Sequence, residues 1–380
     1  MMKRLGDYIR PVDVRNRDLK VTRLLGVSIT KEFMPSIANI VGTDLSAYKV
    51  VTKGQFAYGP VTSRNGDKIS VALLDGYDDA IISQAYTVFE VVDTNALDPE
   101  YLMMWFRRPE FDRYARFHSH GSAREVFDWD EMCEVQVPVP DIKEQCNIVA
   151  EYKTLQTRID TNKKLIATLE QAAQTLYRHT FVDNIDLGNL PEGWRMGVFT
   201  DLVQIGGGGT PSTAIPEYWQ NGKVPFYAPG DKTREYYTLE TEKHITEMGL
   251  NKCSSRLYPE NTTFVTARGA TTGGISLSAK PMAMNQTCFA LLPKGHSCKL
   301  YTHQLSLATM ESLKTEAIGA TFEALTTIDF QKKSIIVPSE GLILKFDESV
   351  SPVYKSILLR QQENQTLTQM QTLLLSKMGV

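Results

Sequence analysis

Two short loops carry residues whose types suit the reading of DNA bases. They are SRNGDK (63–68), which contains Arg64, and ARGATTGG (267–274), which contains Arg268. Each sets one arginine among small residues that form hydrogen bonds, so the backbone can approach a groove while the guanidinium reaches a guanine edge. The alternative interpretation of each loop is a hairpin turn with an arginine on its surface.

An arginine-rich segment lies between these loops in the sequence. Residues 105–124 interleave arginines with aromatic side chains, a composition that suits phosphate contacts on one side and core packing by the aromatics on the other. A solvated helix face explains the pattern equally well. Lys232 and Arg234 add local positive charge after the glycine run GGGGTPS (206–212). No Lys-Ser or Lys-Thr follows that run, so we do not interpret it as a nucleotide-binding loop.

The residues that could support catalysis do not form a complete catalytic or metal-binding set. Asp141, Glu151 and Lys153 have the spacing of a metal-dependent nuclease motif. Ten helical residues would place the two carboxylates about 15 Å apart, too far to share a metal ion. His118 and His120 have no third ligand nearby in the sequence. We therefore expect a chain without an active site and without a metal.

These residues sit in an internal repeat. GSAREVFDWDEMCEVQVPVP (121–140) recurs as GATFEALTTIDFQKKSIIVP (319–338) at an offset of 198. Weaker matches upstream align Phe56 with Phe264, Arg64 with Arg268 and Gln84 with Gln286. The repeat predicts one fold used twice, with short strands and a helix over 97–117 that begins at Asp98 and Pro99.

A long helical pattern follows each Val-Pro. Apolar residues from Ile148 to Leu176 alternate steps of four and three, the period of a coiled-coil seam, and residues 346–380 follow at an offset of 202. Asn162 and Asn364 lie near the two midpoints, so an antiparallel pair of helices would bring them together and fix the register. The alternative is that each is a tolerated, partly hydrated seam residue. About 35 helical residues span roughly 50 Å, more than one turn of duplex DNA.

The expected fold class is α+β, with two mixed α/β domains in a pseudo-two-fold arrangement, separated by two long helices that form an antiparallel coiled coil. The predicted boundaries are a first domain at 1–141, a central helix at 142–182, a second domain at 183–340 that opens with a linker at 183–190, and a C-terminal helix at 341–380.

Composition limits the function classes. The 380 residues carry 41 Lys and Arg against 44 Asp and Glu, a net charge of −3, so DNA binding must be local rather than a global field. Five cysteines without a C-x-x-C pair disfavour a disulfide framework. We found neither a long apolar run nor a secretory signal, so we expect a cytoplasmic protein without membrane contact.

The ordered motifs resemble the specificity subunits of Type I restriction-modification systems. They are LPEGW, GGTPS, EYW, VPFY, ARGATTG and MNQ in the second half, and FAYGPVTSRNGDKIS, YTVFE and RPEFDRYARFHSHGSAREVFDWDEM in the first. The resemblance implies that each domain reads one half of a split, asymmetric target in double-stranded DNA, while the helices fix the gap. It also implies two modification subunits that bind S-adenosylmethionine and methylate adenine, and restriction subunits that use ATP and Mg²⁺, with no cofactor on this chain.

The resemblance also assigns residues to the DNA surface. From the ARGATTG and SRNGDK matches these are Arg268, Thr271, Thr272, Arg64, Asn65 and Lys68, with weaker assignments to Gly209, Thr210, Ser212, Ser122, Arg124 and Thr321, and Lys232 added for its charge. Phe322 stands where the first copy has Arg124, so that position need not share a role. A coiled-coil scaffold with protein-binding ends and a stand-alone enzyme acting on DNA are the alternative functions.

Overall fold

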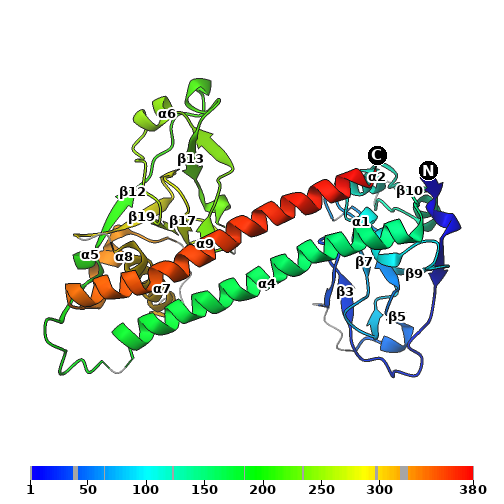
Figure 1. Cartoon of the computed structure of the whole chain (residues 1–380), viewed down its shortest axis with the longest axis horizontal. Coiled ribbons are helices and arrows are strands. Elements are labelled where there is room, and N and C mark those ends of the chain that lie inside the picture. Colours follow the sequence, from blue (N-terminus) through cyan, green and yellow to red (C-terminus); the bar gives the residue numbers. More distant parts are fainter. Residues whose placement is uncertain are drawn as a thin grey trace. The chain divides into compact units, whose positions relative to one another are not determined.

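The computed structural model describes residues 2–36, 42–63, 65–121, 124–183, 185–232, 235–295, 298–316 and 324–379. The chain forms two compact units (Figure 1). Unit 1 is Met1–Arg158 with Leu367–Val380, and unit 2 is Ile159–Thr366. Five residues singled out above, Arg64, Ser122, Arg234, Thr321 and Phe322, lie outside the described residues.

Unit 1 is built on a four-stranded sheet in the order β2-β9-β6-β7. Three further strand pairs surround it, β1 with β10, β3 with β4 and β5 with β8. The strands are β1 (Met2–Arg4), β2 (Ile9–Val12), β3 (Leu25–Val27), β4 (Phe33–Pro35), β5 (Lys49–Thr52), β6 (Phe56–Tyr58), β7 (Val71–Leu73), β8 (Asp79–Ile82), β9 (Thr87–Val91) and β10 (Gln136–Pro138). The helices are α1 (Pro99–Phe106), α2 (Pro109–Phe117) and α3 (Trp129–Glu134), with part of α4 (Ile142–Phe181) and of α9 (Glu340–Lys377).

The single helix expected over 97–117 is wrong, because the chain forms α1 and α2 there. The predicted start holds: Asp98 caps α1 by accepting hydrogen bonds from the N–H groups of Glu100 and Tyr101, and Pro99 follows it. Pro109 then interrupts the helix, since proline disfavours a helical residue before it and has no N–H to donate. The second helix starts at that proline.

Unit 2 contains a five-stranded sheet, β12-β19-β16-β17-β14, and a three-stranded sheet, β15-β13-β18. The strands are β11 (Arg195–Val198), β12 (Val203–Gly207), β13 (Val224–Tyr227), β14 (Tyr237–Thr238), β15 (Lys243–Ile245), β16 (Thr263–Thr266), β17 (Ile275–Ser278), β18 (Ala283–Met284), β19 (Cys288–Pro293) and β20 (Ser334–Val337), where β11 pairs with β20. The helices are α5 (Phe199–Leu202), α6 (Glu247–Asn251), α7 (Lys299–Glu316) and α8 (Thr327–Lys332).

The internal repeat is visible in strand order. The sheet β2-β9-β6-β7 of unit 1 recurs as β12-β19-β16-β17 in unit 2, with antiparallel pairing throughout. Helices α3 and α8 each precede a strand, β10 and β20, that pairs with the first strand of its unit, and each such strand leads into a long helix. The expected α/β domains and long helices are therefore confirmed.

The strand register corrects one sequence match. Phe56 pairs with Leu73 and Phe89, whereas Thr263 pairs with Leu277 and Leu291, so Phe56 corresponds to Thr263 rather than to Phe264. A shift of one residue moves a side chain to the opposite face of a sheet. Phe56 accordingly lies in the core beneath α1, while Phe264 lies in a separate cluster. Gln84 and Gln286 share the offset of 202 found between β9 and β19.

The long helices pack together antiparallel within unit 2. Asn162 contacts Asn364, and the ring of Tyr177 lies 5.9 Å from that of Phe346. Residues later in α4 therefore contact residues earlier in α9, as in antiparallel packing. In unit 1, Val149 and Tyr152 share a core with Met378. Tyr177 is buried where the strict repeat placed Leu176, because a straight helix of 3.6 residues per turn drifts away from a 3.5 period.

Each unit also fixes its long helix by a polar side chain, which is buried in unit 1 and half-buried in unit 2. In unit 1, Gln145 accepts a hydrogen bond from the Asp98 N–H and donates to the Ala96 and Pro140 carbonyls. In unit 2 the equivalent residue is Asp347, whose carboxylate accepts from the N–H groups of Leu300 and Tyr301 at the start of α7. These contacts attach each long helix to the domain that precedes it.

Candidate nucleic-acid interface

In unit 1 the loop after β6 lies against the loop before α3. Val61 forms an isolated antiparallel bridge with Val126, which also bridges His120. Thr62 donates its hydroxyl hydrogen bond to Ser119 Oγ at 2.9 Å, and its N–H to the Glu125 carbonyl at 3.0 Å. The start of SRNGDK and the end of the GSAR region therefore form one surface.

Unit 2 repeats this arrangement. Arg268 forms the same kind of bridge with Ala324, and the Leu325 N–H donates to the Ala267 carbonyl at 2.8 Å. The ladder offset of 207 between β6 and β16 makes Arg268 the counterpart of Val61. At this bridge the structure therefore aligns Arg268 with Val61, whereas the sequence match aligns it with Arg64.

The two loops also differ in length. Twelve residues, 59–70, join β6 to β7, whereas eight, 267–274, join β16 to β17. Asn65 and the exposed Lys68 lie on the longer loop, where the Asn65 amide donates to the Val61 carbonyl. Arg268 and Thr271 are exposed on the shorter loop, and Thr272 donates its hydroxyl to the Gly269 carbonyl.

In unit 2 three separate sequence motifs meet beside this loop. The N–H of Gly209 donates to the Met284 carbonyl at 3.0 Å, and the hydroxyl of Thr210 donates to the side chain of Gln286. The Ala267 N–H donates to the Thr287 carbonyl at 2.8 Å. GGTPS, MNQ and ARGATTG thus lie together at one end of the strands β12, β16 and β19. Gln286 was not singled out as a site residue, although its place in MNQ was a signal that could have found it.

Gly208 explains why this loop needs glycine. A Cβ at Gly208 would lie 1.9 Å from the Asn285 carbonyl oxygen, and one at Gly209 would lie 2.1 Å from Ser254 Oγ. The loop 208–212 can therefore approach the strand edge only without side chains at these two positions. Thr210 and Ser212 follow and are exposed.

Lys232 lies at the other end of the ARGATTGG loop, 3.5 Å from where a Cβ of Gly274 would stand. Its ammonium donates to the Glu235 carbonyl at 3.2 Å. Burial lowers the pKa of Lys232, and nearby Glu170 and Glu235 oppose that shift. Burial and the charge of Glu235 raise the pKa of Glu170, on α4, to about 7. Lys232 is thus half-buried beside carboxylates, less free to contact DNA than its charge suggested.

The arginine-rich segment of unit 1 is mostly engaged within the protein. Arg108 is buried with its guanidinium 4.1 Å above the Trp105 ring, and Arg107 lies over Tyr152. Arg116 forms an ion pair with Glu125, and Arg113 forms one with Glu110. Arg124, by contrast, is exposed. Arg107 and Arg108 therefore pack within the fold, while phosphate contact by the exposed Arg113, Arg116 and Arg124 stays a prediction.

Phe117 contradicts the expectation that the aromatics of this segment supply the core. It is the last residue of α2 and is 81% exposed. The helix turns Phe111 into the core and packs Tyr114 against it, whereas Phe117 lies six residues after Phe111, past one and a half turns. An exposed aromatic side chain beside the loop pair adds apolar surface to the candidate interface.

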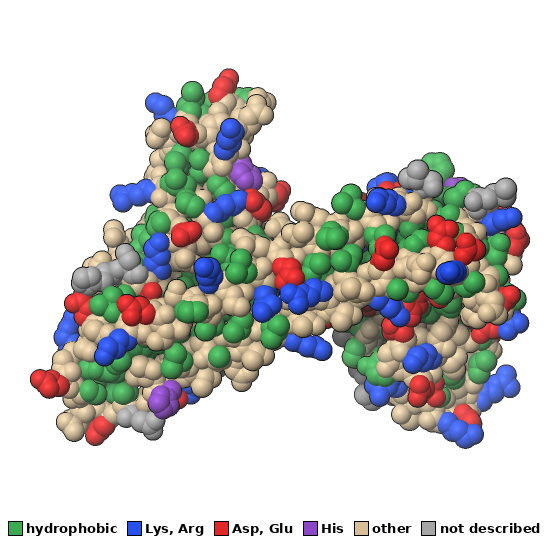
Figure 2. Space-filling view, viewed as in Figure 1, with side chains coloured by type: hydrophobic (Ala, Val, Ile, Leu, Met, Phe, Trp, Pro, Cys, Tyr) green, Lys and Arg blue, Asp and Glu red, His purple; other side chains and the backbone are tan. Residues whose placement is uncertain are grey.

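The charged side chains do not form a surface of one sign on the visible face (Figure 2). On the face seen in Figure 2, acidic and basic side chains are interspersed over the surface. With a net charge of −3, affinity for DNA must come from oriented loops.

The residues weighed for catalysis have structural contacts. Asp141 caps α4 by accepting from the Glu144 N–H, and Lys153 forms an ion pair with Glu100. His118 and His120 both face Glu131. Within the described part of the chain, no group of three or more His, Cys, Asp or Glu side chains could hold a metal ion. Among those same residues, no helix is long and apolar enough to cross a membrane.

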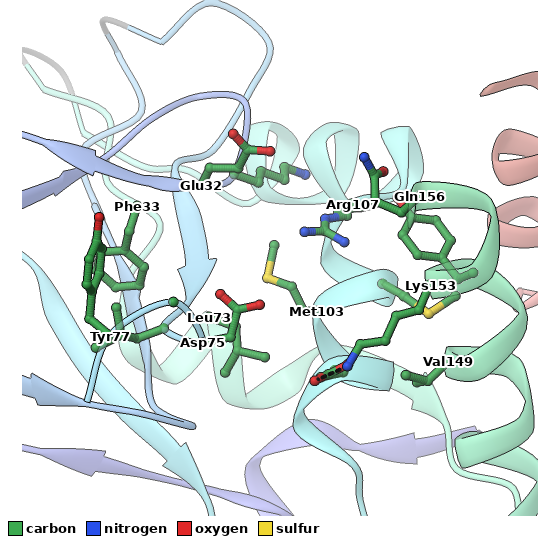
Figure 3. A pocket seen from close by; sticks show the side chains of 16 residues that line it. Glu32, Phe33, Leu73, Asp75, Tyr77, Met103, Arg107, Val149, Lys153 and Gln156 are labelled. Carbon is green, nitrogen blue, oxygen red and sulfur yellow. Dashed lines mark hydrogen bonds and ion pairs between the residues drawn. The ribbon is translucent and has the colours of Figure 1, made fainter. Parts of the chain in front are cut away.

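A pocket of about 340 Å³ in unit 1 lies between α1, α4, the β3–β4 hairpin and the turn after β7 (Figure 3). Met103 and Val149 contribute apolar surface, while Glu32 and Asp75 stand among the same walls as Arg107. Because carboxylates and cations alternate, the pocket offers no field of one sign to attract a polyanion.

The coiled-coil asparagines meet in unit 2. The Asn162 amide donates to Asn364 Oδ1 at 3.0 Å and to Glu363 Oε2 at 2.9 Å, and Asn162 Oδ1 accepts from Arg360 at 3.2 Å. Both asparagines are buried. Buried polar groups in such a network are costly to leave unpaired, so the contact penalises a slipped register.

Comparisons with known proteins agree with one another. Residues 191–369 match the family model of the Type I restriction modification DNA specificity domain. The Type I restriction enzyme HindI specificity subunit of Haemophilus influenzae is 24% identical over 414 residues, covering 90% of this chain and 89% of that protein. The MjaIX specificity subunit of Methanocaldococcus jannaschii is 34% identical over 158 residues, covering 40% of this chain and 36% of that protein.

A solved structure shares the fold. The S subunit of a Type I restriction-modification system from M. genitalium aligns over 100% of this chain and 95% of that chain, with a TM-score of 0.62 and 15% identity. This similarity concerns the arrangement of two mixed α/β domains and long paired helices.

Proposed function

Residues 191–369 match the family model of the Type I restriction modification DNA specificity domain, and on this premise we propose that the chain is a DNA-recognition subunit in which each unit reads one half of a bipartite target. The recognition domains are residues 1–141 and 183–340. The helices 142–182 and 341–380 set the gap between the two half-sites.

The observation that carries the proposal is the repeated bridge. Each unit has such a bridge, Val61 with Val126 in unit 1 and Arg268 with Ala324 in unit 2. The two bridges join equivalent loops at equivalent points of the two sheets. Loops held on a rigid scaffold suit base reading, because the scaffold fixes their approach while their sequences vary. The contents of the two loops differ, as two unlike half-sites require.

Chemistry then belongs to partner subunits. We propose two modification subunits that bind S-adenosylmethionine and methylate adenine, and restriction subunits that use ATP and Mg²⁺. The chain itself acts in the cytoplasm on double-stranded DNA and has no catalytic residue. Asp141 and Lys153 support this division, since their contacts hold α4 in place.

Methylation mapping tests the function. The full chain is co-expressed with its cognate modification subunit, and methylated adenines are located across the host genome. We expect one split motif with two specified halves and a gap of fixed length. Methylation at unrelated sequences would favour the coiled-coil scaffold, and methylation or cleavage by the purified chain alone would favour the enzyme.

A further inference from the structure

Lys31 occupies an unusual position in unit 1. It lies in the turn between β3 and β4 with a backbone φ of +65°, a region that residues other than glycine seldom adopt. Its side chain is only 5% exposed, and its ammonium lies 2.8 Å from Asp112 Oδ1. The same ammonium donates to the Phe106 carbonyl and lies 5.5 Å from the Phe111 ring. The buried contacts hold the turn in this conformation.

Asp112 connects this lysine to the SRNGDK loop. The carboxylate lies on α2 and is 13% exposed. Its Oδ1 atom also accepts a hydrogen bond from the Ile69 N–H at 3.2 Å. Ile69 is fully buried and directly follows Lys68, the last residue of the loop. One oxygen therefore bonds both a buried cation and the end of a candidate base-reading loop.

We propose that Lys31 and Asp112 are positioning residues that hold the SRNGDK loop of unit 1 in the geometry with which it reads its half of the target. The inference rests on the proposed function of unit 1. Neither residue faces solvent enough to contact DNA itself, so they act through the loop.

The loop needs an anchor of this kind because it is long. Its start is held by Thr62, which contacts Ser119 and Glu125, and its end is held by Ile69. The shorter loop of unit 2 is bridged at its start in the same way, but its end is held by its own backbone, with the Gly273 N–H donating to the Thr266 carbonyl and the Gly274 N–H to the Thr271 carbonyl. A twelve-residue connection without a fixed end would sample many conformations.

The ion pair with Lys31 fixes the position of the Asp112 carboxylate. Burial lowers the pKa of Lys31, while the Asp112 carboxylate opposes that shift. A buried cation without its counter-ion is strongly unfavourable, so Lys31 holds Asp112 close to one position. The Asp112 carboxylate then offers the Ile69 N–H an acceptor at a fixed place.

Two double variants separate positioning from stability. K31M/D112N and K31M/D112L both replace the buried ion pair by neutral side chains of similar size. Asn at 112 keeps a carbonyl oxygen that can accept from the Ile69 N–H, whereas Leu does not. Each full-length variant is co-expressed with the cognate modification subunit, methylated sites are mapped, and thermal unfolding of the purified complexes is recorded.

We expect K31M/D112N to keep the wild-type target. In K31M/D112L, discrimination against wrong bases in the half-site read by unit 1 should fall about tenfold, while the other half-site stays unchanged. Equal discrimination in the two variants would overturn the proposal. So would a loss in both half-sites, or a simple decrease in methylation of an unchanged motif, which is what a merely structural role predicts.

A third variant covers the case in which Leu at 112 prevents folding. D112E keeps the charge of the pair but moves the acceptor by one methylene, so relaxed reading of the same half-site is expected, and an unchanged motif would count against the anchor. Failure of the proposed function is distinguishable, because wild-type complexes would then give no split motif at all.

Discussion

The loop between β6 and β7 and the loop between β16 and β17 occupy equivalent places in the two units, yet they are held in different ways. Both make hydrogen bonds within their own backbone, and both are bridged from outside at their start. The first is four residues longer, and near its end the Ile69 N–H donates to the Asp112 side chain on α2; near the end of the second, Gly273, with φ of +77°, donates its N–H to the Thr266 carbonyl. A shared sheet thus sets where a loop begins and ends, while its length decides what must hold it.

The bridge position carries a second difference. Val61 is 38% exposed and apolar, whereas its counterpart Arg268 is exposed and charged. Under the proposed function, unit 2 would present the Arg268 guanidinium to a base directly from the bridge, where the backbone is fixed on both sides. Unit 1 would present polar residues farther along its loop, Asn65 and Lys68 among them.

Exchange of a whole recognition unit should give the largest effect. Replacing residues 1–140 by the corresponding domain of another specificity subunit is expected to replace one half-site completely and leave the other unchanged, because each loop pair belongs to one unit. Methylation mapping measures this. The reciprocal exchange of 183–340 is the matched control, and a change in both halves from either exchange would contradict the modular comparison.

Arg268→Ala tests the bridge position itself. We expect a base-specific loss of about 1–3 kcal/mol in binding of the assembled complex, seen as relaxed preference at one target position. Binding to duplexes substituted at each position in turn measures it. V61A, at the equivalent bridge, should change binding by less than about 0.5 kcal/mol. A uniform loss over all sequences would instead assign Arg268 to a phosphate.

These contrasts also mark what the sequence could predict. The repeat, the α/β domains and the long helices follow from periodic burial, which a sequence records directly. The register of Phe56 against Thr263 does not, since neighbouring positions with similar residues differ only in the face they occupy. The offset of 198 holds through the α3 and α8 regions, whereas the upstream match of Phe56 with Phe264, made at another offset, missed the register by one residue.

The candidate site was predictable in part for a related reason. Loops rich in glycine and polar residues could be located, but their partners could not, because Thr62 with Ser119 and Lys31 with Asp112 are far apart in the chain. Arginine composition was misleading at Arg108, which stacks on Trp105 inside the fold. Phe117 was misassigned because periodicity alone does not show where a helix stops packing.

The polar seam pairs allow a third comparison. Asn162 contacts Asn364 in unit 2, while Gln371 donates to Gln156 at 3.0 Å in unit 1. We expect N162L/N364L to fold, with the unfolding free energy changed by less than about 2 kcal/mol, and to methylate targets with more than one gap length. Q156L/Q371L is the control. Its longer, more flexible side chains specify register less, so its gap should stay fixed; a fixed gap in both variants would remove the asparagines from this role.

The smallest expected effect is the change in stability when a carboxylate is neutralised on the unit 2 part or on the unit 1 part of α4. Glu170 in unit 2 has a pKa raised from 4.5 to about 7, so the folded state binds its proton more tightly than the unfolded state does. Ionisation therefore costs stability, and the cost grows between pH 4.5 and 7 and is complete above pH 7. E170Q removes that cost and should raise the unfolding free energy at pH 8 by about 1 kcal/mol, a value reduced for partial solvent screening, with no change at pH 4.5.

Urea unfolding of E170Q at the two pH values measures this difference. E151Q removes an exposed carboxylate from the unit 1 part of the same helix and is the matched control, expected to have no effect at either pH. The two results together would show that the stability cost of a carboxylate on α4 comes from burial and from Glu235 at position 170, and not from carboxylates on this helix in general. Equal stabilisation by E170Q at pH 4.5 and pH 8 would mean that packing, rather than the charge of Glu170, sets the cost.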